Sequence, residues 1–293
     1  MRVGLIGYGA WGRCHASALL RIEGAKLAAV LCQGAASAAA AQAELPGVAV
    51  VRSLEALLAL DLDAVDIVAP NHLHADLAVA ALHAGRHVLL EKPLATTIED
   101  CERIIAASRA SGRVVSVTHE MRASPQWGRI RQEIAAGAIG RPCFASFTLF
   151  RHPFRAGSAG WRHDRARVGS WLLEEPVHFF DLLLWYFAES GAPVSLQAAG
   201  TADALAENIT VTVRFSDGAA FVVTQMLGGF GHHCSLTLSG SDGAVRTWWS
   251  ADTARSAAPS FALEIRRGRA APEAVAIAAS GERLPGRSRR IAA

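Results

Sequence analysis

The chain has 293 residues, of which 51% are hydrophobic and 19% charged, and its formal net charge is +3 at pH 7. This composition is typical of a globular enzyme with two domains, each long enough to bury a core. The net charge is small and the arginines are scattered until the last dozen residues, which argues against a nucleic-acid-binding surface. No apolar run is long enough to cross a membrane, and the N-terminus enters a strand without a signal peptide. We therefore expect a cytoplasmic protein.

A glycine-rich turn follows the first apolar run, Arg2 to Ile6, which is typical of a buried parallel strand. The turn Gly7-Tyr8-Gly9-Ala10-Trp11-Gly12 then leads into a helical stretch. Gly7 permits the tight turn, Gly9 lets the backbone approach a pyrophosphate, and Gly12 lets the helix pack closely on the strand. Phosphates would face the helix N-terminal amides. The turn predicts a dinucleotide site at Gly7, Gly9, Ala10, Trp11 and Gly12; the alternative is that the glycines only pack helix on strand.

Strand-like and helical segments alternate over residues 1–118, which predicts an α/β domain with a doubly wound parallel sheet, the Rossmann fold. Ligands of such sheets bind outside the carboxyl ends of the strands. Three segments are expected there: the glycine turn, the run from Pro70 to His74, and Glu91-Lys92-Pro93. The further strands are expected at Lys26 to Leu31, Ala64 to Ala69, Arg86 to Leu90 and Arg113 to Thr118, and the helices at Ala35 to Glu44, Ala75 to Ala84 and Ile98 to Ser111.

After residue 118 longer β-like stretches follow, with a hairpin signal at Asp217-Gly218. They are Pro142 to Arg151, Ser195 to Gly200, Asn208 to Phe215, Ala219 to Leu227 and Ser235 to Ser239. Residues 119–280 are therefore predicted to form an α+β domain with a largely antiparallel open sheet, for substrate binding and oligomerisation. Helices are expected at Ser124 to Gly137 and Pro176 to Phe187. Residues 281–293 form a basic tail broken by glycine and proline, which we expect to be disordered.

The order of several motifs resembles one family. These motifs are the glycine turn, Pro-Asn-His-Leu-His at 70–74, Glu-Lys-Pro at 91–93, the Arg122 segment, Gly-Ala-Ile-Gly-Arg-Pro at 137–142, Gly-Trp-Arg at 160–162 and His-Phe-Phe-Asp at 178–181. The chain resembles the glucose-fructose oxidoreductase, inositol dehydrogenase and rhizopine-catabolism (Gfo/Idh/MocA) family over residues 1 to about 240. The resemblance implies an NAD(P)-dependent dehydrogenase.

In that family the lysine of Glu-Lys-Pro and the histidine of His-x-x-Asp face the nicotinamide and the reacting carbinol. Carried over, these residues are Lys92 and His178, and Glu174 stands where the family has a catalytic aspartate. Pro176 replaces the usual glycine between them. The resemblance also places Glu91 near the ribose. The two departures leave full efficiency in polyol oxidation open.

The chemistry can also be argued from the residues. Removal of a hydride from a secondary alcohol leaves a proton on oxygen, so the site needs a base and a group that stabilises alkoxide character. Lys92 suits either role. His178, in the first turn of an apolar helix, can accept a proton or bind a hydroxyl; the alternative is a core histidine. Asp181 lies one turn further on and could orient His178 or be structural.

Further residues are candidates for contacts with the substrate or the cofactor. Arg122, Trp161 and Arg162 suit a carbohydrate or carboxylate pocket, with Asp181 beside them. Asn71, His72, His74 and Pro70 are expected near the nicotinamide ribose, although loop histidines are often merely exposed. Adjacent strand residues point to opposite faces, so His232-His233-Cys234 predicts no metal site.

Cofactor choice stays open. The end of the second strand reads Leu31-Cys32-Gln33-Gly34, without the Asp or Glu that would bind an adenosine ribose, and no arginine follows that would bind a 2'-phosphate. We therefore predict NAD or NADP, with Cys32, Gln33 and Ser37 as contacts.

Three functions remain at this point. The first is an oxidoreductase acting on a secondary hydroxyl of a sugar, inositol or related compound, which we expect to be a homo-oligomer, dimer or tetramer. The second is a redox-assisted glycoside hydrolase with tightly bound NAD. The third is a nucleotide-binding protein that has lost turnover.

Overall fold

The computed structural model describes residues 1–201, 208–229, 231–252 and 258–277. The predicted tail at 281–293 lies outside these residues. The chain divides into two compact units. The N-terminal unit contains residues 1–118 together with His163–Gly169, and the C-terminal unit contains residues 119–162 and 170 onward.

The N-terminal unit is built on a six-stranded parallel sheet with the order β3-β2-β1-β4-β5-β6. The chain leaves β1 toward β2 and β3, then crosses to β4 on the other side of β1, so the sheet is doubly wound as predicted. The strands are β1 (Arg2–Ile6), β2 (Lys26–Leu31), β3 (Ala49–Val51), β4 (Ala64–Ile67), β5 (His87–Glu91) and β6 (Val115–Thr118).

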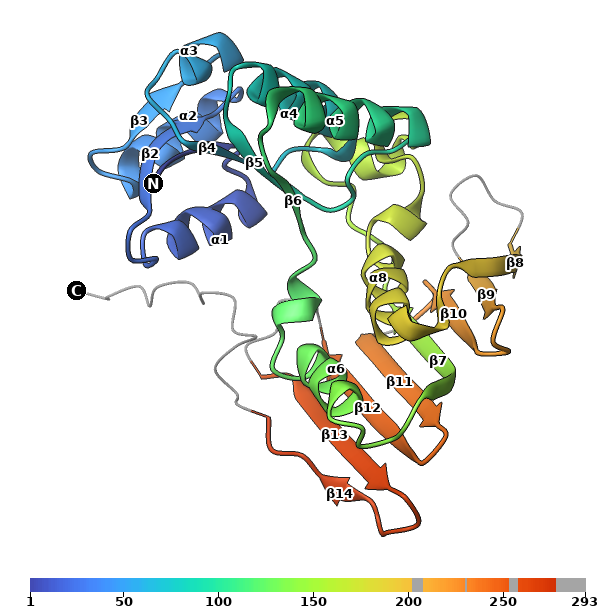
Figure 1. Cartoon of the computed structure of the whole chain (residues 1–293). Helices are drawn as coiled ribbons and strands as arrows, with labels where there is room; N and C mark the ends of the chain where they lie inside the picture. The colour runs from blue at the N-terminus through green and yellow to red at the C-terminus, as the bar shows by residue number, and fades with distance from the viewer. Residues whose placement is uncertain (202–207, 230, 253–257, 278–293) are drawn as a thin grey trace, which may run out of the picture. The chain divides into compact units, whose positions relative to one another are not determined.

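Helices cover both faces of this sheet, which is why its central strands are almost continuously apolar. One buried cluster joins Leu5 of β1 to Ala16 of α1 and Ala38 of α2. A second joins Ile67 of β4 to Leu82 of α4 and Ile104 of α5 on the other face, and α4 and α5 lie side by side (Figure 1). The helical segments are α1 (Ala10–Leu19), α2 (Ala35–Glu44), α3 (Leu54–Leu58), η1 (Asn71–Leu73), α4 (His74–His83) and α5 (Ile98–Ser111).

A segment from much later in the chain, His163–Gly169, belongs to the N-terminal unit. Its short helix α7 (Arg165–Val168) is capped by Asp164, whose carboxylate accepts a hydrogen bond from the amide of Ala166 at 3.0 Å. The carbonyl of Val168 accepts a hydrogen bond from the side chain of Asn71 at 3.4 Å. The segment is thereby attached to the loop that follows β4.

The C-terminal unit contains an eight-stranded sheet with the order β14-β13-β12-β11-β7-β10-β9-β8. β7 and β10 are parallel and the other pairs are antiparallel, which confirms the predicted largely antiparallel sheet. Gly218, with φ of +86°, forms the predicted turn between β9 and β10. The strands are β7 (Pro142–Arg151), β8 (Pro193–Gly200), β9 (Ile209–Phe215), β10 (Ala220–Met226), β11 (His232–Gly240), β12 (Gly243–Ala251), β13 (Ser260–Arg267) and β14 (Glu273–Ala274).

Two helices pack on one face of this sheet, α6 (Trp127–Ala135) and α8 (Pro176–Tyr186) (Figure 1). The Phe179 ring of α8 stacks on the Phe147 ring of β7 with the ring centroids 3.9 Å apart. Within the residues that the structure describes, no helix is both long and apolar enough to span a membrane. The remaining short segments are η2 (Glu120–Ala123), η3 (Ser158–His163), η4 (Trp171–Leu173) and η5 (Ala188–Ser190).

Candidate active site

The glycine turn between β1 and α1 has the geometry of a phosphate-binding loop. Gly7 has φ of +97°, and a Cβ there would lie 2.1 Å from the carbonyl oxygen of Val68. A Cβ on Gly12 would lie 2.1 Å from the carbonyl oxygen of Gly7, so the helix can approach the strand only with glycine at this position. Gly9 has no atom within 4 Å of such a Cβ, which leaves open space over the turn. The structure therefore confirms the tight turn at Gly7 and the close packing at Gly12, and it leaves space over Gly9.

The start of α1 fits the pyrophosphate of a dinucleotide. Gly9 is its N-cap and provides no side-chain hydrogen bond, and the first turn carries no acidic residue. The amides of that turn have no acceptor within the helix, and the helix dipole favours an anion there. The turn also lies at the point where the strand order reverses, between β1 and β4, which is where doubly wound sheets bind nucleotides.

The loop after β2 contains the residues predicted to contact the adenosine ribose. Cys32 is buried, and burial raises the pKa of its thiol, so the side chain is neutral. Gln33 is exposed, and the Ser37 hydroxyl donates a hydrogen bond to the carbonyl of Gly34 at 2.9 Å. The guanidinium of Arg52, which follows β3, donates a hydrogen bond to the carbonyl of Gln33. Sequence analysis missed Arg52, because its position beside this loop depends on the pairing of β2 with β3.

The loop from Pro70 to His74 follows β4, at the same edge of the sheet as the glycine turn. Asn71 is buried and its amide is bonded to Val168. His72 is partly exposed, and burial, followed by the Arg167 guanidinium, lowers its pKa. His74 is fully buried, with Nδ1 2.7 Å from the carbonyl oxygen of Pro93 and Nε2 2.9 Å from that of Ala69. Burial lowers the pKa of His74. Its ring therefore ties the loop after β4 to the loop after β5, and both ring nitrogens already face backbone carbonyls.

Glu91, Lys92 and Pro93 end β5 and begin the loop beyond it. Glu91 is buried, Lys92 is partly exposed, and the Lys92–Pro93 peptide bond is cis. The run therefore places one half-buried lysine at the carboxyl edge of the sheet, directly after a buried carboxylate.

A buried ionic network lies next to this lysine. Nδ1 of His15, on α1, lies 2.9 Å from a carboxylate oxygen of Asp66, and Nε2 lies 3.1 Å from one of Glu91. Burial alone would lower the pKa of His15, but the hydrogen bonds with Asp66 and Glu91 outweigh it and raise the pKa to about 10. His15 is therefore a cation at neutral pH. The imidazolium links α1, β4 and β5 at the edge of the sheet that carries the predicted site.

Sequence analysis predicted Glu91 but missed His15 and Asp66. The sequence does contain one indication of a buried ion pair. Asp66 interrupts the apolar run Ala64–Ile67, and a charged side chain in a strand covered on both faces needs a buried partner. The identity of the partner depends on the fold, because His15 is 51 residues away in the chain.

In the C-terminal unit, Glu174 and His178 lie around the start of α8 and both are buried. The Glu174 carboxylate forms an ion pair with the guanidinium of Arg162, which lies 4.4 Å from the ring centroid of Trp161. Nε2 of His178 lies 3.4 Å from a carboxylate oxygen of Glu120. The structure therefore joins two predicted residues, Glu174 and Arg162, in one pair and places Trp161, itself buried, against the arginine.

Asp181 and Arg122 form a second pair in this unit. Nε and Nη2 of Arg122 donate to the two carboxylate oxygens of Asp181 at 2.7 and 2.6 Å. Nδ1 of His119 lies 3.7 Å from the same carboxylate. The His119 ring packs edge-on against the His178 ring, with the ring centroids 5.8 Å apart. The His119 ring therefore contacts both the Asp181 carboxylate and the His178 ring.

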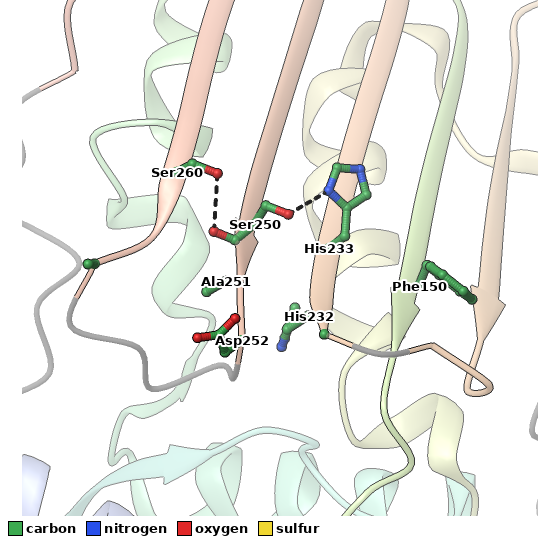
Figure 2. Close-up of a pocket in the computed structure, with 9 residues that line it drawn as sticks. Phe150, His232, His233, Ser250, Ala251, Asp252 and Ser260 are labelled. Atoms are coloured by element: carbon green, nitrogen blue, oxygen red, sulfur yellow. Dashed lines mark hydrogen bonds between the residues drawn. The ribbon is translucent and has the colours of Figure 1, made fainter.

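A hollow of about 380 Å³ opens at the ends of β11, β12 and β13. Figure 2 shows His233 and Ser250 pointing toward each other from adjacent strands, and Nδ1 of His233 lies 3.0 Å from the Ser250 hydroxyl oxygen. His232 faces the other side of the sheet, where its Nε2 lies 3.0 Å from Glu175, which also pairs with Arg151. Among the described residues, no group of three or more His, Cys, Asp and Glu side chains could hold a metal ion. The lining residues are Phe150, Gly231, His232, His233, Ser250, Ala251, Asp252, Ala258 and Ser260.

Known proteins resemble both units. A family model described as an oxidoreductase family with an NAD-binding Rossmann fold matches residues 1–119, and one for the GFO/IDH/MocA C-terminal domain matches residues 127–246. The 1,5-anhydro-D-fructose reductase of Ensifer adhaerens is 32% identical over 74% of this chain and 66% of its own length. Inositol 2-dehydrogenase 4 of Saccharopolyspora erythraea is 30% identical over 84% of this chain and 73% of its own length.

Among solved structures, the WlbA dehydrogenase from Bordetella pertussis, in complex with NADH and UDP-GlcNAcA, matches with a TM-score of 0.76 at 26% identity. The match covers 84% of this chain and 73% of that chain. This chain thus spans roughly two thirds to three quarters of the length of these three proteins. The resemblance inferred from the motifs is confirmed, and the chain belongs to the GFO/IDH/MocA oxidoreductase family, with an NAD-binding Rossmann domain followed by the C-terminal domain of that family.

Proposed function

We propose that this protein is an NAD(P)-dependent dehydrogenase that transfers a hydride between the cofactor and a secondary hydroxyl of a sugar, inositol or related compound. The observation that carries the proposal is the edge of the N-terminal sheet. A phosphate-binding turn and the half-buried Lys92 both lie at the carboxyl ends of its strands. The relatives named as an anhydrofructose reductase and an inositol dehydrogenase support the substrate class.

Bound NAD(P) would supply the hydride acceptor. The residues of this chain have to manage the proton on the substrate oxygen, and we assign that role to Lys92. An amine at this position can take up the proton, and in its ammonium form it can stabilise negative charge on the oxygen. Glu91 and His15 hold the segment that carries Lys92, and His74 positions the loop after β5 through the carbonyl of Pro93.

We assign Gly7, Gly9, Ala10, Trp11 and Gly12 to the pyrophosphate of the cofactor. The residues that we assign to its ribose groups are Cys32, Gln33, Ser37, Pro70, Asn71, His72 and Glu91. His74 acts in this proposal by positioning the loop, because both of its ring nitrogens face backbone carbonyls.

We assign substrate recognition to the polar cluster of the C-terminal unit. His178 would bind or deprotonate a hydroxyl. Glu174 would set the orientation of Arg162, which offers its remaining N–H groups to hydroxyls. Trp161 supports that arginine, and the Arg122–Asp181 pair presents polar groups beside His119.

The experiment that tests this proposal is a thermal-shift titration with NAD⁺, NADP⁺ and their reduced forms, followed by absorbance at the reduced-nicotinamide band across a polyol panel. We expect stabilisation by a dinucleotide and reduction on at least one sugar or inositol. Release of product from an aryl glycoside without net cofactor reduction would favour the hydrolase alternative. Tight binding without turnover on any polyol or glycoside would favour a binding protein.

We also propose that the protein is a homo-oligomer. In the C-terminal unit, α6 and α8 cover one face of the sheet, while large apolar side chains such as Phe144 and, on the edge strand β8, Val194 and Leu196 are exposed. A second copy of the chain covering these side chains would remove them from water. Sedimentation velocity is expected to give a dimer or tetramer, and a monomer at micromolar concentration would contradict this assignment.

A further inference from the structure

The loop after β2 and the residue after β3 lie side by side. β2 and β3 are parallel neighbours, with Leu31 paired to Val51, and the amide of Cys32 donates to the carbonyl of Val51 at 3.1 Å. Gln33 and Arg52 therefore leave the sheet together at its carboxyl edge. In a doubly wound dinucleotide-binding domain, the groups at the end of the second strand meet the ribose of the adenosine half.

Arg52 holds a positive charge at this loop. One N–H of its guanidinium is bonded to the carbonyl of Gln33, a neutral acceptor, and the side chain is exposed. Within the described part of the chain, no carboxylate lies at ion-pair distance from Arg52. Arg13 differs in this respect, because its Nη1 lies 2.6 Å from the carboxylate of Glu44. Arg13 is neutralised, whereas Arg52 keeps N–H donors for an external anion.

The loop also lacks the negative charge that would repel a phosphate. Residues 31–43 contain no Asp or Glu, and the Cys32 thiol is kept neutral by its burial. The next acidic residue, Glu44, has both carboxylate oxygens engaged, one by Arg13 and the other by the hydroxyl of Tyr8. An Asp or Glu at the strand end binds the hydroxyls of an unmodified ribose, whereas a nearby arginine accommodates a 2'-phosphate.

We infer that this chain binds the 2'-phosphorylated dinucleotide, NADP, in preference to NAD, and that Arg52 recognises the 2'-phosphate. The inference rests on the nucleotide site of the proposed function. The guanidinium can present two N–H groups to phosphate oxygens, an arrangement that arginine provides and lysine does not. The small residues Gly34, Ala35 and Ala36 leave space at the loop, and the Ser37 hydroxyl lies beside it.

The test is a pair of dissociation constants, for NADP⁺ and NAD⁺, measured by isothermal titration calorimetry on the full chain without substrate. One hydrogen bond to a charged group contributes about 1.5–3 kcal/mol, so we expect NADP⁺ to bind at least roughly 10- to 100-fold more tightly than NAD⁺. Arg52→Ala should remove most of this preference by weakening NADP⁺ binding, with the NAD⁺ constant changed less than about threefold. Arg109→Ala, an exposed arginine on α5 of the same unit, is the matched control and should change neither constant.

Three results would overturn the inference. Equal or tighter binding of NAD⁺ by the unaltered protein would show that there is no 2'-phosphate site, and this comparison needs no variant. An equal loss of both affinities in Arg52→Ala would show that Arg52 supports the loop rather than the phosphate. Binding of neither dinucleotide would contradict the proposed function itself, whereas NAD⁺-selective binding would leave that function intact.

Discussion

Lys92→Ala is expected to lower turnover by roughly 10²- to 10⁴-fold, the range typical for loss of a general acid or base. The amine is the group assigned to the substrate proton, and alanine can neither accept that proton nor stabilise charge on the oxygen. The dinucleotide affinity should change little, because the phosphate-binding turn is elsewhere on the sheet edge. The measurement is the steady-state rate of cofactor reduction with the best substrate of the polyol panel, beside the dissociation constant of the cofactor.

The sequence offers a matched control for this change. The chain has only two lysines, and the second, Lys26, is exposed at the start of β2, at the opposite end of the strand from the ligand-binding edge. Lys26→Ala should leave turnover unchanged. If Lys92→Ala keeps the rate of the unaltered protein, Lys92 has no part in proton transfer and the assignment is wrong.

His15→Leu is expected to destabilise the protein by roughly 3–5 kcal/mol at neutral pH, the cost of removing one partner from a buried ionic group. The substitution leaves the carboxylates of Asp66 and Glu91 buried without their cation; these residues are 1% and 5% exposed. Chemical denaturation followed by tryptophan fluorescence measures the free energy of unfolding. His83→Leu, at an exposed histidine at the end of α4, is the control and should cost much less.

The same network predicts a pH dependence. The folded protein holds the His15 proton up to about pH 10, whereas an unfolded histidine releases it near 6.5. The stabilisation from His15 is therefore fully present below pH 6.5 and is lost as the pH rises toward 10. Cys32 and Cys101, whose pKa values are raised by burial, also reduce stability at high pH. The difference between the unaltered protein and His15→Leu isolates the histidine and should shrink between pH 7 and 10. A difference that stays constant over this range would show that His15 is not a buried cation.

Much of the N-terminal unit could be predicted from sequence because its local signals agree. The bounds of β2, α2 and α5 are those expected from apolar periodicity, and Gly7 and Gly12 have the conformational roles assigned to them. The elements missed here, β3 and α3, have three and five residues, too few for periodicity to show. In the C-terminal unit β12, β13 and β14 escaped prediction. In β12, Trp248 and Trp249 stand next to each other and break the alternation of a strand.

The site was predictable only where one segment carries the chemistry. Lys92 and Glu91 could be predicted from their place at the end of β5, but the partners of site residues come from other parts of the chain. His15 reaches Glu91 across 76 residues, and Arg52 reaches Gln33 across 19. For His74, the sequence correctly placed the loop at the carboxyl edge of the sheet. It did not show that the ring is fully buried between two backbone carbonyls, because that depends on how the loops pack.

The most direct test of the proposed chemistry follows the hydrogen itself. Each active polyol of the panel is prepared with deuterium on its carbinol carbons and incubated with the protein and oxidised cofactor, and the reduced cofactor is analysed by mass spectrometry. The account predicts that the reduced nicotinamide gains one deuterium from the substrate in a single turnover. Reduced cofactor without deuterium, or polyol oxidation with no change in the cofactor, would contradict hydride transfer to a nicotinamide as the function of this chain.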